Sequence, residues 1–133
     1  MKIYNLILVA GLFIFSACAQ SQQTEQSNVK NLSAVEFKAA IKSGEVQLVD
    51  IRTPNEYNMG HINGAIMVDF YSSDFKANLN KLDKNVPIYI YCRSGSRTSK
   101  TIGLLQSLGF KEIVNLHSGL IDWQRSGYSL SQG

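Results

Sequence analysis

The stretch of this sequence that most constrains the fold joins an apolar strand to a helix through a short polar loop. Residues 87–91 read Pro-Ile-Tyr-Ile-Tyr and predict a buried strand. Residues 92–97 read Cys-Arg-Ser-Gly-Ser-Arg, and a helical pattern then runs over residues 98–108 until Gly109 closes it. The stretch therefore predicts a strand–loop–helix unit with Cys92 at the carboxyl end of the strand.

The rest of the chain repeats this alternation. Further strands are predicted over residues 46–51, 65–68 and 112–116, and further helices over residues 33–42, 53–60 and 73–82. Two helix starts carry capping boxes, Ser33 with Glu36 and Thr53 with Glu56. Strands that alternate with such helices indicate an α/β fold with a mainly parallel sheet. Ligands of these sheets bind beyond the carboxyl ends of the strands, where Cys92 lies.

Composition limits the class of protein. The 133 residues and 44% hydrophobic content suit one globular domain. The net charge is only +3, and no basic stripe with interleaved aromatic residues occurs, so we expect no nucleic-acid partner. Neither histidine has a partner at metal-ligand spacing, so we expect no metal and no other cofactor.

The first 17 residues have the pattern of an export signal. An apolar run from Ile3 to Phe15 is too short for a membrane span, and two small residues follow it. Ending in small residues and then Cys18, the segment resembles a bacterial lipoprotein signal, in which Cys18 is lipidated and becomes the new N-terminus. The alternative is an ordinary secretory signal that is cut nearby.

This interpretation divides the chain into three parts. Residues 1–17 are the signal peptide, the polar residues 18–30 are a lipid-anchored tether, and residues 31–133 are the domain. We expect the protein in the cell envelope, held to the membrane only by its N-terminal lipid. It would face the periplasm, or the outside in a cell without an outer membrane.

Cys92 is well placed to form a reactive thiolate. Loop N–H groups can surround the sulfur, the following helix directs its positive end at it, and two loop arginines add charge. If Cys18 is lipidated, Cys92 is the sole remaining thiol and has no disulfide partner within the chain. The alternative is a buried, inert cysteine, but the polar residues that follow favour the reactive one.

Four stretches resemble the rhodanese family of sulfurtransferases. The first runs from Leu-Val-Asp-Ile-Arg at 48–52, through Glu-Tyr at 56–57, to Gly-His-Ile-Asn-Gly-Ala at 60–65. The second is the loop at 92–97, similar to the family's Cys-Arg-x-Gly-x-Arg. The third is Leu-Gly-Phe at 108–110. The fourth runs from Leu-His-Ser-Gly at 116–119 through Trp123 to Gly-Tyr at 127–128, with Ser118 where the family usually has glycine.

Together the four stretches extend over about residues 30–130. The resemblance implies a rhodanese-like α/β fold, with a central, mainly parallel sheet that helices flank on both faces. It also implies a sulfurtransferase of the thiosulfate:cyanide type, in which Cys92 takes a sulfane sulfur and becomes a persulfide. A thiolate suits this cycle because it is both a good nucleophile and a good leaving group.

The loop residues after Cys92 would bind the persulfide and an anionic donor. This predicted binding set is Arg93, Ser94, Gly95, Ser96, Arg97 and Thr98. Its amides would hold the negative charge of the persulfide, while Arg97 and Arg93 would attract the donor. For either arginine, the alternative is a side chain that faces solvent.

Four further residues are predicted to be structural rather than catalytic. Asp50 and Arg52 are expected to form an ion pair that joins two loops, and the alternative is a contact with the substrate. Glu56 caps a helix and has a second possible role, a salt bridge that orients an active-site arginine. His61 lies in a Gly-His-Ile turn, and this structural role is favoured over that of a general base.

Two other functions fit parts of the pattern. Cysteine phosphatases and arsenate reductases place five residues between cysteine and arginine, whereas four lie between Cys92 and Arg97. A membrane-tethered module for binding or sensing is the second alternative, although this chain retains the cysteine. We expect a monomer that takes sulfur from a small anion such as thiosulfate and passes it to cyanide or a thiol, protein thiols included.

Overall fold

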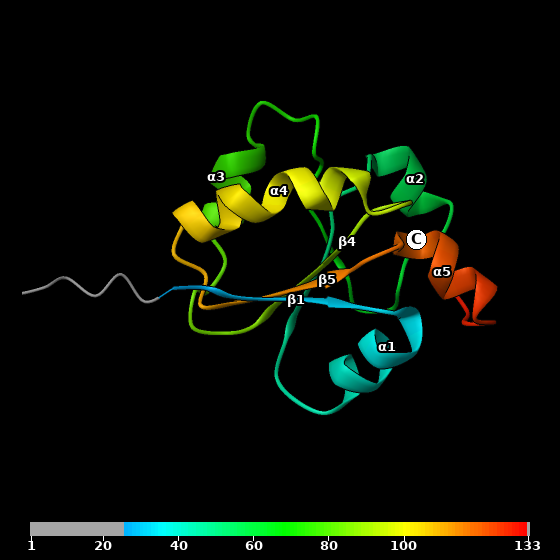
Figure 1. Ribbon diagram of the computed structural model, residues 1–133. Coiled ribbons are helices and arrows are strands. Elements are labelled where there is room, and N and C mark those ends of the chain that lie inside the picture. Colours follow the sequence, from blue (N-terminus) through cyan, green and yellow to red (C-terminus); the bar gives the residue numbers. More distant parts are fainter. Residues whose placement is uncertain (1–25, 133) are drawn as a thin grey trace, which may run out of the picture.

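The computed structural model describes residues 26–132, in which strands and helices alternate (Figure 1). In chain order the elements are β1 (Asn28–Leu32), α1 (Ala34–Lys42), β2 (Gln47–Asp50), α2 (Pro54–Asn58), β3 (Ile66–Met67), α3 (Phe75–Asn80), β4 (Ile88–Tyr91), α4 (Ser96–Ser107), β5 (Glu112–Leu116) and α5 (Gly119–Arg125). The predicted signal peptide, Cys18 and most of the predicted tether lie outside the described residues. Within residues 26–132, no helix has the length and apolar character needed to cross a membrane.

The strands form one parallel sheet in the order β1-β5-β4-β2-β3. β4 is the middle strand, and all four of its residues are buried. Because the strands are parallel, their carboxyl ends lie at one edge of the sheet, and Cys92 follows β4 at that edge. The predicted α/β fold is confirmed.

Helices cover both faces of the sheet, as predicted. Tyr91 belongs to a core on one face, together with Phe37 of α1. Ile90 belongs to the core on the opposite face, with Leu79 of α3 and Leu105 of α4. Figure 1 shows α3 and α4 on one side of the strands and α1 on the other. Both cores therefore hold β4, and with it Cys92, at the centre of the molecule.

Both predicted capping boxes are present. The Ser33 hydroxyl accepts the N–H of Glu36 at 3.4 Å, and the Glu36 carboxylate accepts the N–H of Ser33 at 2.9 Å. The same exchange joins Thr53 and Glu56 at 3.3 and 3.0 Å. The second box holds the Glu56 side chain at the start of α2, beside the carboxyl edge of the sheet.

The domain begins earlier than predicted. Residues 28–30, assigned to the tether, are the first part of β1, which pairs with β5 from Asn28 to Leu32. Only Val29 and Leu32 give apolar side chains to the cores. The backbone ladder with β5 holds this mostly polar strand, and a ladder between distant segments leaves no local pattern in the sequence.

Two helices also differ from the prediction. α4 begins at Ser96, so Arg97 lies in the first turn of the helix rather than in the loop before it. α5 was not predicted at all. It is only seven residues long and has no side-chain cap, and Leu120 and Trp123 anchor it in the core. Tertiary packing rather than helix propensity stabilises a helix this short.

Candidate active site

Cys92 lies in a cradle of backbone N–H groups at the carboxyl end of β4. Its side chain is 1% exposed, and its Sγ accepts the N–H of Gly95 at 3.1 Å. The Thr98 hydroxyl lies 3.9 Å from the same sulfur and donates to the carbonyl of Gly95 at 3.0 Å. The loop therefore curls back over the sulfur as it enters α4.

This cradle favours the thiolate. The backbone N–H groups directed at the sulfur belong to Thr98, Ser94, Gly95 and Arg97. Burial works to raise the pKa of Cys92, but these N–H groups outweigh burial and hold the pKa below the ordinary value for a cysteine. Hydrogen bonds to the charged form, rather than a neighbouring base, are what activate this thiol.

The loop can close this tightly only because position 95 is glycine. Gly95 has φ +92°, and a Cβ there would lie 2.0 Å from the carbonyl oxygen of His117. The segment after β5 thus packs directly against the cradle. No side chain fits between the two backbones.

A second glycine holds the other side of the cradle. Gly119 has φ +61°, and a Cβ there would lie 2.5 Å from the carbonyl oxygens of Cys92 and Arg93. The same two carbonyls accept the N–H groups of Leu120 and Ile121 at 3.0 and 3.1 Å. α5 therefore supports the cysteine loop through its backbone.

The serine at position 118 does not disturb this turn. Ser118 has φ −103° and ψ 14°, a conformation open to any residue. Gly119 alone carries the positive φ and the close approach. The departure from the family's usual glycine therefore falls on the position that does not need one.

Arg97 is held by an ion pair. Its guanidinium donates to both carboxylate oxygens of Glu56, at 2.8 and 2.7 Å, and thus joins α4 to α2. The hydrogen bonds from Arg97, reinforced by those of the Thr53 cap, lower the pKa of Glu56 to about 2. The salt bridge considered for Glu56 is present, and Arg97 does not face solvent.

Asp50 and Arg52 form a buried ion pair at the end of β2. The Arg52 Nη2 lies 2.7 Å from Asp50 Oδ2, and the same nitrogen donates to the carbonyl of Gly60 at 2.7 Å. The pair thus links the strand end to the turn that follows α2, which is the structural role expected for it. The Nε and Nη2 groups of Arg52 are therefore committed to Asp50 and Gly60.

His61 is also used structurally. Its ring stacks on Tyr57 with centroids 3.7 Å apart, and its Nδ1 lies 3.1 Å from the carbonyl of Tyr57. Its backbone exchanges two hydrogen bonds of 2.8 Å with Ser131. His61 therefore fastens the C-terminal segment to the turn after α2, and the structure gives it no contact with Cys92.

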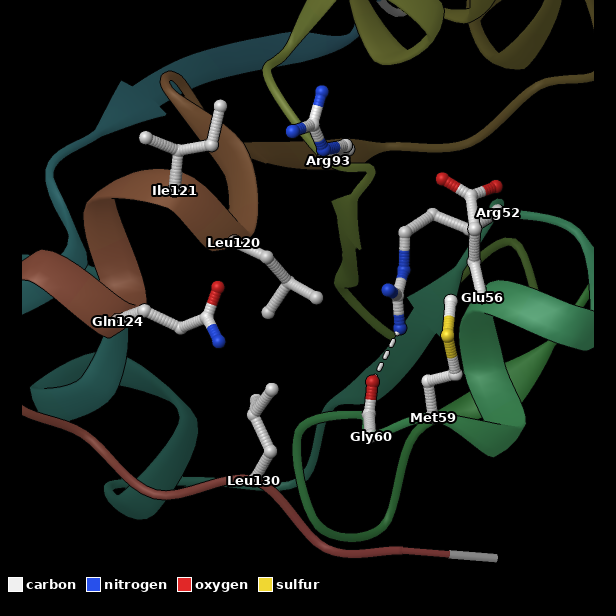
Figure 2. Close-up of a pocket in the computed structure, with 9 residues that line it drawn as sticks. All are labelled: Arg52, Glu56, Met59, Gly60, Arg93, Leu120, Ile121, Gln124 and Leu130. Atoms are coloured by element: carbon white, nitrogen blue, oxygen red, sulfur yellow. Dashed lines mark hydrogen bonds between the residues drawn. The ribbon is translucent and has the colours of Figure 1, made fainter.

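Arg93 is different from the other arginines of the site. Its side chain is exposed, and nothing in residues 26–132 pairs with its guanidinium. It lies above a cavity of about 240 Å³ (Figure 2). The remaining loop residues of the predicted binding set, Ser94 and Ser96, are exposed beside it.

The walls of this cavity combine residues that the sequence had not singled out. They are Met59, Leu120, Ile121, Gln124 and Leu130. Arg52, Glu56 and Gly60, which belong to the motifs described above, also line the cavity. Figure 2 shows Leu120, Gln124 and Leu130 facing Arg52 and Met59 across the cavity. Of the five wall residues that the sequence had not singled out, all except Met59 come from α5 or the segment after it. Because α5 was not predicted, no signal pointed to them.

The site has no arrangement for a metal ion in the described part of the chain. Residues 26–132 contain no group of three or more histidine, cysteine, aspartate or glutamate side chains that could hold one.

The fold and the site define an α/β protein with a buried, activated cysteine at the end of its central strand. Residues 33–126 match the family described as "Rhodanese-like domain". The chain therefore belongs to the rhodanese-like family.

Curated relatives agree with this assignment. The chain is 33% identical over 118 residues to the uncharacterized protein YqhL of Bacillus subtilis, covering 89% of each chain. It is 35% identical over 83 residues to a protein named sulfurtransferase from Allochromatium vinosum, covering 62% of this chain and 76% of that one. Other relatives are named tRNA uridine(34) hydroxylase, and the chain covers only 33% of the one from Cytophaga hutchinsonii.

A solved structure shows the same fold. A rhodanese-like domain protein from Staphylococcus aureus superposes with a TM-score of 0.67 at 32% identity. The match covers 78% of this chain and 98% of that one.

Proposed function

We propose that this protein is a sulfurtransferase that moves a sulfane sulfur from an anionic donor such as thiosulfate to a thiophilic acceptor through a persulfide on Cys92. The observation that carries the proposal is the cradle, in which loop N–H groups lower the pKa of a buried thiol. Membership of the rhodanese-like family and the relative named sulfurtransferase support it.

The proposed cycle has two displacements at sulfur. In the first, the Cys92 thiolate attacks the outer sulfur of thiosulfate, the S–S bond breaks, and sulfite leaves with the electron pair of that bond. Cys92 then carries a persulfide. In the second, a thiolate or cyanide attacks the terminal sulfur and displaces the Cys92 thiolate, which restores the enzyme. No external oxidant or reductant is needed.

The cradle stabilises the negative charge at each stage. The thiolate, the persulfide and the departing thiolate are all anionic at or near Sγ, where N–H groups converge and water is excluded. These donors are in place before the reaction, so little reorganisation is needed.

The two loop arginines have separate roles in this proposal. Arg97 is already paired with Glu56, so it supplies a fixed positive charge that keeps α4 and α2 in position. Arg93 is unpaired among the described residues and lies above the cavity, so its guanidinium receives the anionic donor. In this proposal, donor binding therefore depends more on Arg93 than on Arg97.

The loop length favours sulfur transfer over phosphate chemistry. Four residues lie between Cys92 and Arg97, and Arg97 is committed to a carboxylate. A phosphatase needs its arginine free to clamp two oxygens of the phosphoryl group. The loop is one residue shorter than the loop of those phosphatases, and Arg97 is not free.

We also propose that Cys18 is lipidated and holds the domain in the cell envelope. The apolar run to Phe15 and the two small residues before Cys18 support this proposal.

Mass spectrometry of the purified protein tests the proposed activity. After exposure to thiosulfate or a polysulfide, Cys92 should gain the mass of one sulfur atom, and cyanide or a thiol should remove it. Cys92→Ser should show no gain while it keeps the melting temperature of the wild type. Failure of the wild type to gain sulfur, or sulfur transfer by Cys92→Ser, would contradict the proposal.

A further inference from the structure

A second cavity, of about 300 Å³, lies between α1, α5 and the C-terminal segment. It shares no lining residue with the cavity beside Arg93. The lining residues that matter for its chemistry are Lys38, Ile41, Lys42, Asn63, Trp123 and Tyr128. Its volume is within the range of small-molecule sites, which begins at about 300 Å³.

One wall of this cavity is aromatic and apolar. The rings of Trp123 and Tyr128 pack edge to face with centroids 5.0 Å apart. Trp123 is 4% exposed, and its Nε1 donates to the carbonyl of Ser129 at 3.1 Å. Because the polar atom of the indole is already satisfied, Trp123 offers the cavity only its apolar surface. Ile41 of α1 adds to this wall.

The rim of the cavity is cationic. Lys38 and Lys42 are four residues apart on α1, so both lie on the face that lines the cavity. The Lys38 Nζ lies 3.7 Å from the centre of the Tyr128 ring. In the described chain, neither lysine has a carboxylate partner.

The nearest carboxylates along these two helices are engaged elsewhere. Asp122 of α5 accepts the N–H of Ala34 at 2.7 Å. Glu36 of α1 accepts both the N–H and the hydroxyl of Ser33. Among the described residues no carboxylate forms an ion pair with Lys38 or Lys42, so the two ammonium groups can pair with an anion.

We propose that this cavity is a binding site for a small amphiphile with an apolar chain and one carboxylate. The chain would lie against Trp123, Tyr128 and Ile41, and the carboxylate would bind between the two lysine ammonium groups. A concave site of this size suits a single small molecule better than a flat membrane surface. The site is independent of the chemistry at Cys92.

The only tryptophan of the chain lies in this cavity, so its fluorescence reports on the site directly. Titration of the full chain with octanoate, below the concentration at which it forms micelles, should change Trp123 emission to saturation. 1-Octanol and octylammonium should bind at least tenfold more weakly, because they lack the anion. The Cys92→Ser variant should bind octanoate like the wild type, so the test is separate from sulfur transfer.

Matched charge variants test the role of the rim. Lys38→Gln combined with Lys42→Gln should weaken octanoate binding about tenfold, since it removes two exposed charge pairs of modest strength. Lys76→Gln combined with Lys100→Gln removes the same charge from exposed positions of α3 and α4 and should leave binding unchanged. Amide resonances of Asn63 and Ser129 should shift with octanoate.

Three outcomes would overturn the proposal. They are the absence of a saturable change in emission, equal binding of octanoate and octanol, and equal weakening by the two pairs of lysine variants. A larger emission change with phosphatidylglycerol vesicles than with octanoate would instead identify the face as a membrane contact.

Discussion

At the scale of single residues, the protonation state of the Cys92 thiol should determine how fast it reacts with a sulfur donor. A lowered pKa means that the thiolate remains the main form as pH falls below the value for an ordinary cysteine, about 8.5. The rate of persulfide formation should therefore begin to decrease only at a lower pH than the rate of an ordinary cysteine thiol would.

Measurement of the thiosulfate reaction rate against pH tests this expectation. The thiolate absorbance of the wild type minus that of Cys92→Ser should titrate with the same midpoint. A midpoint at or above that of a free cysteine would show that burial outweighs the amide cradle.

The two loop arginines should respond differently to truncation. Arg93→Ala should lower kcat/KM for thiosulfate by about 10- to 100-fold, the value of a hydrogen bond to a charged group. Transfer from an uncharged sulfane donor should hardly change, because the lost interaction is with the anion. Arg97→Ala should slow sulfur transfer from both donors to the same extent, since it removes a fixed charge and leaves Glu56 without its ion-pair partner.

Arg125→Ala is the control for net charge, because Arg125 is exposed at the end of α5. This substitution should not change the rate of sulfur transfer from either donor. A selective loss of thiosulfate turnover in Arg97→Ala, with Arg93→Ala unaffected, would reverse the assignment.

At the scale of elements, the contact between the cysteine loop and the segment after β5 depends on glycine. Gly95→Ala would place a Cβ 2.0 Å from the His117 carbonyl in a residue with φ +92°. The backbone must move apart, so we expect a loss of about 3 kcal/mol or more in the free energy of unfolding. Sulfur transfer should be lost as well, because the cradle opens.

Gly103→Ala provides a matched control, because Gly103 lies within α4, the helix that Gly95 precedes. A Cβ at Gly103 meets nothing within 4 Å, and alanine favours the helix by about 0.5–1 kcal/mol. Urea unfolding should therefore show stabilisation for Gly103→Ala and destabilisation for Gly95→Ala. Similar effects of the two substitutions would contradict the close packing described for the loop.

The ion pair between α2 and α4 should make stability depend on pH. The pKa of Glu56 is lowered from 4.5 to about 2 in the folded state. Its contribution is therefore complete above about pH 4.5 and is lost as pH falls toward 2. Glu56→Gln should cost roughly 1–3 kcal/mol at neutral pH, and the difference from wild type should shrink on acidification.

Chemical unfolding at several pH values between neutrality and about pH 2.5 would measure this difference. The control is Glu45→Gln, because Glu45 is exposed. A difference between Glu56→Gln and wild type that is independent of pH would contradict an ionic origin.

At the scale of the whole molecule, the proposed lipid anchor determines where the domain works. The mature protein should carry acyl chains on Cys18 and fractionate with membranes. Cys18→Ala should accumulate as an uncleaved or mislocalised precursor, because the processing signal lacks its acceptor thiol. Mass spectrometry of the mature N-terminus would detect the acyl chains, and recovery of a soluble, unlipidated wild type would refute the anchor.

Most of the strands and helices were predictable from the sequence. Each predicted strand and helix is present, because apolar periodicity and capping boxes act over neighbouring residues; β1 and α5 are present but were not predicted. The cysteine loop was predictable for the same reason. Its glycine, its serines and the following helix lie within a few residues of Cys92.

Interactions between distant segments were decided only by the tertiary structure. β1 forms through its ladder with β5, about 84 residues along the chain, and α5 is stable because Leu120 and Trp123 are buried. The pairing of Arg97 with Glu56 spans 41 residues, and it decides which loop arginine remains free for a substrate. The local sequence determines which residues are charged or chemically reactive. Which of them meet, and which stay unpaired, follows from packing that no local pattern records.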